Sequence, residues 1–413
     1  MENLDSLRDF IRSHPLIDSH AHTVLNKDDV HYNLEAIASA AEGNAVLNAE
    51  TSLPSLRAFN QLSEFYGSRC DNWSDVEHNH EKLARDDYEG LVRRCVKDTD
   101  TLLLDDHLEF LEDAEAFKPF GWHDRLTTSP TKRILQIEAL AEAEILYIAK
   151  TERREGETVW DRFRKRFLEA LDRAMEDRNV VAFKTVICSR TGLNVDPHTS
   201  DDTTLAGSLI RTLDLGTRGL GFKVEDKPLC DWLVQQTLKA ISVGWRKVDS
   251  TARALQFDVG LGDNSMILER ANPACLQPLI AQYTSARIVL LHSAYPFTRE
   301  AGYLASVYEN VYLCLGGPFP MISRDGQEKI IRESLELTPS KRLLWGTDNN
   351  CHPEGFWLAN LQFRQALEKV LVDYVQHGDL TIDQAKNITA RILFKTANTV
   401  YHLLLEPKIT SEA

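Results

Sequence analysis

The feature that most constrains the fold is a series of short apolar segments separated by longer amphipathic ones. Most of these short segments are continuous apolar runs without period-two alternation, which is typical of parallel strands covered on both faces. Between them lie stretches with apolar residues at helical spacing, including 158–177 and 229–245. Eight strands alternating with helices predict an α/β fold, a (β/α)8 (TIM) barrel. The expected strands are 15–19, 101–106, 133–138, 180–187, 254–259, 287–292, 310–315 and 342–347.

Two parts of this pattern need comment. The segment 132–150 also fits a single helix, and in that case the third expected strand would not exist. Residues 27–100, between the first two strands, form a charged stretch with a mostly helical pattern, far longer than one crossover requires. No repeat or low-complexity linker divides the chain of 413 residues, which is 43% hydrophobic and can bury one large core. We therefore expect a single domain over 1–413 with a helical insertion at 27–100 that covers the barrel mouth.

Composition excludes several classes of partner. A net charge of −15 and a pI near 5.4 argue against binding to nucleic acid. No apolar run approaches the ~20 residues that a membrane span needs, and the charged N-terminus lacks the apolar core of a signal peptide. The cysteines show no CxxC spacing, so we expect free thiols in a cytoplasmic protein. They are Cys70, Cys95, Cys188, Cys230, Cys275, Cys314 and Cys351.

The carboxyl ends of the expected strands carry polar side chains, and barrel enzymes place their chemistry there. His20 and His22 follow the first strand in "PLIDSHAH". In an extended segment residues i and i+2 face the same side, so the two imidazoles form half of a divalent-metal site, or else a pair of surface histidines. The other strand ends supply metal-ligand and proton-transfer residues. These are Asp105, Asp106, His107, Lys184, Arg190, Asp258, His292 and Asp348.

The motifs together resemble the amidohydrolase superfamily. The match runs from residue 15 to about 371 and is carried by "PLIDSHAH", "VVAFKTVICSRTGL", "LQFDVGLGD", "NPACLQPLI", "VLLHSAYPFTREAGYLASVYENVYL", "FPMISRDGQEKIIRESLELTPSKRLLWGTD" and "PEGFWLANLQFRQALEKVL". It is most similar to the amidohydrolase domain fused to a glutamine-synthetase-like domain in fungal developmental regulators and plant nodulin-like proteins. The resemblance implies metal ligands at HxH after strand one, at His after strands five and six, and at Asp after strand eight. Because the glutamine-synthetase-like half has no counterpart here, we expect a free-standing barrel, and family habit favours a homodimer.

Three positions depart from the family pattern. Asp258 stands where the family has the strand-five histidine. Gly316 and Gly317 stand where the family tends to have an acidic group after strand seven, and Asn349 and Asn350 follow the strand-eight aspartate in place of Gly-His. The pocket has therefore either been retuned for another substrate or reaction, or has lost its metal chemistry.

We favour retuning, because a carboxylate at position 258 can still bind a metal. His20, His22, Asp258 and Asp348 then form a set of two histidines and two carboxylates for one divalent ion, zinc first, with manganese or iron as alternatives. The alternative is that Asp258 pairs with Lys184 or an arginine. The surviving histidines and Asp348 would then work without a metal.

The resemblance also assigns roles. Asp348 is the general base of the superfamily, although an aspartate before "NNCHPE" also fits a helix N-cap. His292 is expected to transfer a proton or to bind a second metal. Lys184 is a carbamylated bridging ligand, a charged partner of a carboxylate or a substrate contact, and the last two suit a single-metal site.

Arginines near the expected rim bear on the substrate. An arginine aimed into a pocket binds carboxylate in bidentate fashion, whereas an isolated one forms a surface salt bridge. Together they favour a small anionic molecule, and we assign them to substrate binding. They are Arg190, Arg299 and Arg324. The primary hypothesis is thus a metal-dependent hydrolase of a C–N, amide-like bond. The alternatives are a metal-dependent decarboxylase or other lyase, and a pseudoenzyme or regulatory barrel with an altered metal site.

Overall fold

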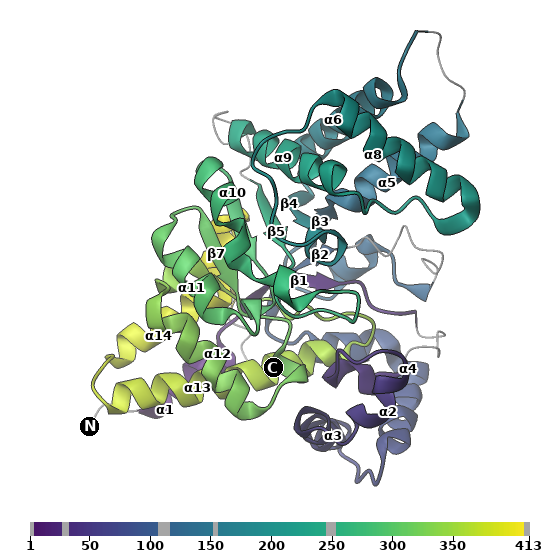
Figure 1. The fold of residues 1–413 in the computed structure, drawn as a ribbon. Helices are drawn as coiled ribbons and strands as arrows, with labels where there is room; N and C mark the ends of the chain where they lie inside the picture. Colours follow the sequence, from purple (N-terminus) through teal and green to yellow (C-terminus); the bar gives the residue numbers. More distant parts are fainter. Residues whose placement is uncertain (1–3, 27–32, 106–115, 152–155, 245–252, 409–413) are drawn as a thin grey trace.

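The computed structural model describes residues 4–26, 33–105, 116–151, 156–244 and 253–408, and it contains one parallel sheet of eight strands in sequential order β1 to β8 (Figure 1). Each strand pairs in parallel with the next strand along the chain, with register shifts between β1 and β2 and between β3 and β4, so the predicted (β/α)8 order is confirmed. The strands are β1 Leu16–His22, β2 Thr99–Asp105, β3 Lys132–Gln136, β4 Val180–Thr185, β5 Ala254–Phe257, β6 Arg287–Leu290, β7 Val311–Cys314 and β8 Leu343–Leu344.

The ring closes through the chain that continues β8. Ser19 N donates to Trp345 O at 3.1 Å, and Asp348 N donates to His20 O at 2.8 Å. Glycine at 346 is required here, because a Cβ would lie 2.7 Å from His20 N. Tight backbone contact between the first and last strands therefore forms the seam of the barrel.

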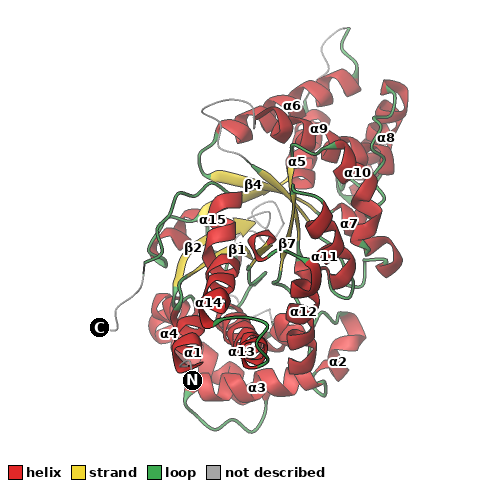
Figure 2. Cartoon of the chain, turned by 90° about the vertical axis from the view of Figure 1, so that its left-hand side faces the viewer, coloured by secondary structure: helices red, strands yellow, loops and turns green. Residues whose placement is uncertain are grey.

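Helices surround the strands on the outside, as Figure 2 shows. The N-terminal helix packs beside the last long helices of the chain, away from the group formed by α5, α6, α8 and α9 (Figure 1). The helices are α1 Leu4–Ser13, α2 Val46–Ala49, α3 Leu53–Tyr66, α4 Trp73–Cys95, α5 Ile137–Lys150, α6 Val159–Glu176, α7 Ile187–Arg190, α8 Asp202–Leu215, α9 Lys227–Gly244, α10 Gln277–Gln282, α11 Thr298–Val307, α12 Arg324–Leu337, α13 Glu354–Gln376, α14 Ile382–Ala390 and α15 Thr396–Val400.

The expected third strand exists, and the alternative of one helix over 132–150 is wrong. Ile134 pairs with β2 and with β4, and α5 begins only at Ile137. The segment "RIL" is thus paired with strands on both sides, and this tertiary pairing outweighs the helical pattern that follows.

The segment between β1 and β2 is helical over much of its described part. It holds α2, α3 and α4, and α3 and α4 pack against α13, which follows β8. Residues 27–32 of the expected insertion, and Asp106 and His107 at the end of the expected second strand, lie outside the described residues.

Two further observations concern the whole fold. All seven cysteines are free thiols. Within the described ranges, none of the helices combines the length and the apolar character that crossing a membrane requires.

Candidate metal centre

The two histidines of β1 are held in fixed orientations by their Nδ1 atoms. His20 Nδ1 lies 2.7 Å from Gln256 Oε1, and the amide nitrogen of Gln256 donates to Ser19 O and Tyr401 Oη. Because the amide nitrogen of Gln256 is used by Ser19 and Tyr401, its oxygen faces His20 and can only accept a hydrogen bond. His20 Nδ1 must therefore carry the proton. His22 Nδ1 lies 3.1 Å from the carbonyl oxygen of Asp105 and must likewise donate. In the neutral rings, both Nε2 atoms therefore present lone pairs.

Asp348 lies where these lone pairs converge. Its Oδ1 is 3.3 Å from His20 Nε2 and 3.8 Å from His22 Nε2, and ligand atoms of the three residues lie within 4.8 Å of one another. His20 Nε2 is buried and makes no aligned hydrogen bond within the described part of the chain. Two imidazole lone pairs facing a carboxylate repel one another unless a proton or a cation lies between them. This donor set fits a divalent cation.

The backbone at Asp348 is left-handed, with φ of 57°. A non-glycine residue in this region is held there by its surroundings, as is common at functional sites. Asp348 does not cap a helix, because α13 begins at Glu354 with Pro353 at the N-cap. The N-cap alternative for Asp348 is therefore wrong.

His292 follows β6 and closes another side of the cluster. Its Nε2 lies 3.2 Å from Asp348 Oδ2 and 3.7 Å from Asp258 Oδ1. Burial lowers the pKa of His292, but the charges of Asp348 and Asp258 outweigh it and leave the pKa above its ordinary value. For Asp348, burial alone would raise the pKa, but the neighbouring His292 and His20 outweigh burial and hold the pKa well below its usual range. Each group thus favours the charged form of the other.

Lys184, near the end of β4, balances two carboxylates. Its Nζ lies 3.0 Å from Asp105 Oδ2 and 3.5 Å from Asp258 Oδ1. Burial lowers the pKa of Lys184, but these two aspartates raise it to a net value above the ordinary one, so the side chain is a cation. Asp258 thus lies beside Lys184 and His292, and it is not part of the group formed by His20, His22 and Asp348.

Two of the three departures from the family pattern have local structural reasons. A Cβ at position 316 would lie 1.5 Å from Gly346 O, and one at 317 would lie 3.0 Å from His292 Cα. Both glycines therefore allow the ends of β6, β7 and β8 to approach. Asn349 is buried, its amide donates to His352 O, and its own carbonyl accepts from His22 N. These residues shape the backbone around the cluster.

The structure does not bring the three predicted substrate-binding arginines to the cluster. Arg190 pairs with Glu142 and Glu225, on α5 and before α9. Arg299 and Arg324 are exposed, at 64% and 68% of their side chains, and pair with acidic residues of α12. The sequence places these guanidinium groups close to strand ends, but each lies on or next to an outer helix with acidic partners within reach. The surface-salt-bridge alternative therefore describes Arg299 and Arg324.

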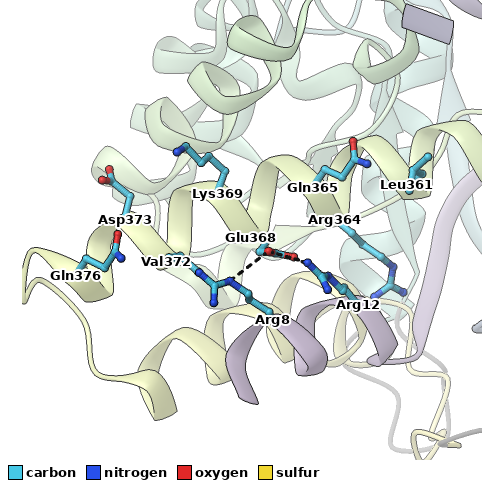
Figure 3. Close-up of a pocket in the computed structure, with 10 residues that line it drawn as sticks. All are labelled: Arg8, Arg12, Leu361, Arg364, Gln365, Glu368, Lys369, Val372, Asp373 and Gln376. Atoms are coloured by element: carbon cyan, nitrogen blue, oxygen red, sulfur yellow. Dashed lines mark hydrogen bonds and ion pairs between the residues drawn. The ribbon is translucent and has the colours of Figure 1, made fainter. Parts of the chain in front are cut away.

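A groove on the outer surface between α1 and α13 is a separate feature (Figure 3). Glu368 lies in it between Arg8 and Arg12, which both pair with its carboxylate. Its central charges are therefore already paired with one another, and none of the predicted site residues lines it.

Sequence reasoning did not assign roles to two residues that shape the centre. Gln256 precedes Asp258 in "LQFDVGLGD" by two positions, so the same alternation that points Asp258 to the mouth also points Gln256 inward. Asp105 was visible at a strand end, and its role as the partner of Lys184 follows from the adjacency of β2 and β4 around β3. Strand alternation was the signal available for both.

Comparisons with known proteins identify the family of the chain. The family model described as Amidohydrolase matches residues 144–375. The protein fluG of Emericella nidulans is 48% identical over 420 residues, which cover 98% of this chain and 48% of fluG, so the chain spans about half the length of that relative.

Solved structures show the same fold. A candidate metal-dependent hydrolase of Lactobacillus casei ATCC 334 has a TM-score of 0.78 at 22% identity, covering 96% of this chain and 97% of that one. A uronate isomerase of Thermotoga maritima has a TM-score of 0.65 at 13% identity, again covering 96% and 97%. The fold, the site geometry and the family match lead to one conclusion: the chain belongs to the amidohydrolase family.

Proposed function

We propose that this barrel is a metal-dependent hydrolase that cleaves a C–N, amide-like bond of a small molecule. His20, His22 and Asp348 would hold one divalent cation, and zinc is the ion that we favour. The observation that supports this is the pair of imidazole lone pairs aimed at one carboxylate, with their Nδ1 atoms fixed by Gln256 and by the Asp105 carbonyl. Such outer partners are typical of metal-bound histidines.

The chemistry divides between the cation and the chain. A divalent cation supplies a Lewis acid that polarises a carbonyl and acidifies water. Asp348, held ionised, accepts a proton from the attacking water as the new C–O bond forms. His292 lies 3.2 Å from Asp348 Oδ2 and relays that proton to the nitrogen that leaves as the C–N bond breaks. Water is thus divided between the acyl product and the amine.

Lys184 and Asp258 have a supporting role in this proposal. The ammonium group of Lys184 offsets the charges of the buried Asp105 carboxylate and the partly buried Asp258 carboxylate. Asp258 Oδ1 makes no hydrogen bond within the described residues and faces His292, so it remains a candidate fourth ligand. We assign it first as the charged partner of Lys184, which differs from the sequence-based expectation.

The pairing of Arg299 and Arg324 with α12 removes the support for an anionic substrate. We place the protein in the cytoplasm on the basis of its free cysteines, and we expect a homodimer from the habit of the family. Cell fractionation and gel filtration test these two proposals.

The deciding experiment strips the protein with a chelator, reloads it with zinc and offers it a panel of small amides and carboxylic acids. We expect amine release from an amide that depends on zinc and falls about 10²–10⁴-fold in Asp348→Asn. His22→Asn should bind one zinc ion fewer per chain, while His78→Asn, an exposed histidine of α4, should behave as the unchanged protein. Carbon dioxide release from an acid would instead identify a lyase, and equal zinc content in the unchanged and His22→Asn proteins would favour a regulatory barrel.

A further inference from the structure

A second cluster of metal-ligand side chains lies between α4 and the start of α13. His80 comes from α4, while His352 and Glu354 come from the chain after β8. Ligand atoms of these three residues lie within 4.8 Å of one another, and the rings of His80 and His352 meet edge to face with centroids 5.4 Å apart. None of the residues assigned to the first centre belongs to this group.

The carboxylate of Glu354 is the centre of this cluster. It is fully buried, and its Oε1 accepts hydrogen bonds from His80 Nδ1 at 2.6 Å and from the hydroxyl of Tyr66. Its Oε2 is also buried and has no hydrogen-bond partner within the described part of the chain. A buried carboxylate oxygen without a partner costs free energy, so something else is expected to satisfy it.

The loop that carries two of the ligands is held rigidly. Asn349 donates to His352 O at 3.0 Å. A Cβ at position 355 would lie 1.7 Å from Asn349 Oδ1, so glycine next to Glu354 lets α13 start against this amide. His352 and Glu354 are therefore positioned before any ligand binds, which lowers the entropic cost of forming a site.

We propose that His80, His352 and Glu354 form a second divalent-cation site, which joins the helical segment after β1 to the start of α13. Two imidazoles and one carboxylate are a donor set that suits zinc and leaves one position open. The proton shared by His80 and Glu354 occupies part of this space. A cation would displace that proton to solvent and engage the free lone pairs of Glu354.

The site differs in purpose from the first centre. Glu354 is fully buried and Tyr66 is hydrogen-bonded to it, so the ligands serve to connect elements more than to receive a substrate. Because the ligands come from α4 and from the chain at the start of α13, a cation bound by them would hold these two segments together. We therefore expect zinc at this position to protect α4 against unfolding.

The test uses the full chain with the first centre removed by His20→Asn and His22→Asn. Equilibrium dialysis against zinc followed by metal analysis should find one ion per chain. Adding His80→Ala should weaken binding at least about tenfold. The matched control adds His78→Ala instead, which removes an exposed histidine two positions away on the same helix and should leave binding unchanged.

A second variant guards against misfolding. Glu354→Gln keeps the side-chain size and the acceptor for Tyr66 while removing the charge, and it should also weaken zinc binding at least about tenfold. Hydrogen exchange should show slower exchange in α4 when zinc is added to the protein with His20→Asn and His22→Asn. If that protein binds no zinc, or if the His80 and His78 variants bind equally, the proposal is wrong.

Discussion

Replacing Gln256 by leucine tests how the first centre is built. The amide of Gln256 is fully buried and connects His20 Nδ1, Ser19 O and Tyr401 Oη. Leucine keeps most of the volume and removes all three hydrogen bonds. His20 would then be free to rotate or to change tautomer, and its Nε2 lone pair would no longer be fixed toward Asp348.

The expected magnitudes follow from those contacts. Outer partners of metal-bound histidines change metal affinity about 10–100-fold, which corresponds to roughly 1.4–2.7 kcal/mol. Leaving buried donors and acceptors without partners costs about 1–3 kcal/mol per group, so Gln256→Leu should lower the free energy of unfolding by several kcal/mol. Gln256→Glu keeps an acceptor for His20 but loses the donor to Ser19 O, so it should lose stability and keep zinc affinity.

The assay is zinc competition with a chromophoric chelator, combined with urea unfolding. Both variants should carry His80→Ala, so that only the first centre is measured. Both variants should lose stability, but only Gln256→Leu removes the acceptor that orients His20. Comparing their zinc affinities therefore separates the effect of His20 orientation from the effect of a less stable barrel. If the folded Gln256→Leu variant bound zinc as tightly as the protein with Gln256, the reasoning about the His20 tautomer would be refuted.

Three further predictions concern stability. Burial raises the pKa of Glu138 to about 7, so the native state holds that proton more tightly than the unfolded chain, whose pKa is near 4.5. Stability from this group is therefore present below pH ~4.5 and is lost as pH rises to about 7. Relative to the unchanged protein, Glu138→Gln should gain on the order of 3 kcal/mol in free energy of unfolding as pH rises across this window. If the free energies of unfolding of the two proteins, measured in urea, changed equally with pH, this expectation would be contradicted. Gly316→Ala places a Cβ 1.5 Å from Gly346 O and should cost about 3 kcal/mol or more, while Gly121→Ala, in open space, should cost little in thermal unfolding. Lys184→Met leaves the buried carboxylate of Asp105 and the partly buried carboxylate of Asp258 without their cation and should lower the free energy of unfolding in urea by about 3–5 kcal/mol; an unchanged free energy of unfolding would refute this.

The sequence was sufficient to predict the barrel because its signals are local and repeated. Each strand is a short apolar run, and the polar residue at its end stands at a fixed place relative to the ring. That logic brought His20, His22, His292 and Asp348 to one point. Lys184 lies close to them, because β4 pairs directly with β5, which leads to Asp258, and only β3 separates β4 from β2, which ends at Asp105.

The arginines could not be placed in the same way. Arg299 and Arg324 follow strands in sequence, but they lie on the first turns of α11 and α12. A helix presents successive residues at intervals of about 100°, so sequence distance from a strand end does not decide whether a side chain faces the mouth or solvent. Acidic residues on α12 decide it here, because they lie within ion-pair distance on the outer surface.

Asp258 was ambiguous for a related reason. Its position at the end of β5 was predictable, but its distance from each possible partner depends on the depth of Lys184 and on the backbone after β6. Lys184 approaches to 3.5 Å, and the left-handed backbone of His292, with φ of 57°, brings that imidazole to 3.7 Å. Neither local feature leaves a periodic pattern in the sequence.

The location of the centre at the barrel seam links its geometry to the integrity of the fold. Asp348 N donates to His20 O, so the hydrogen bond that closes the barrel also fixes the backbones of two proposed ligands. His22 N donates to Asn349 O and repeats the arrangement one step further along. Ligand spacing therefore cannot relax without opening the seam, and opening the seam exposes backbone groups that are now paired. A cation bound there would hold β1 against the chain after β8, so zinc binding at the first centre should be coupled to barrel closure.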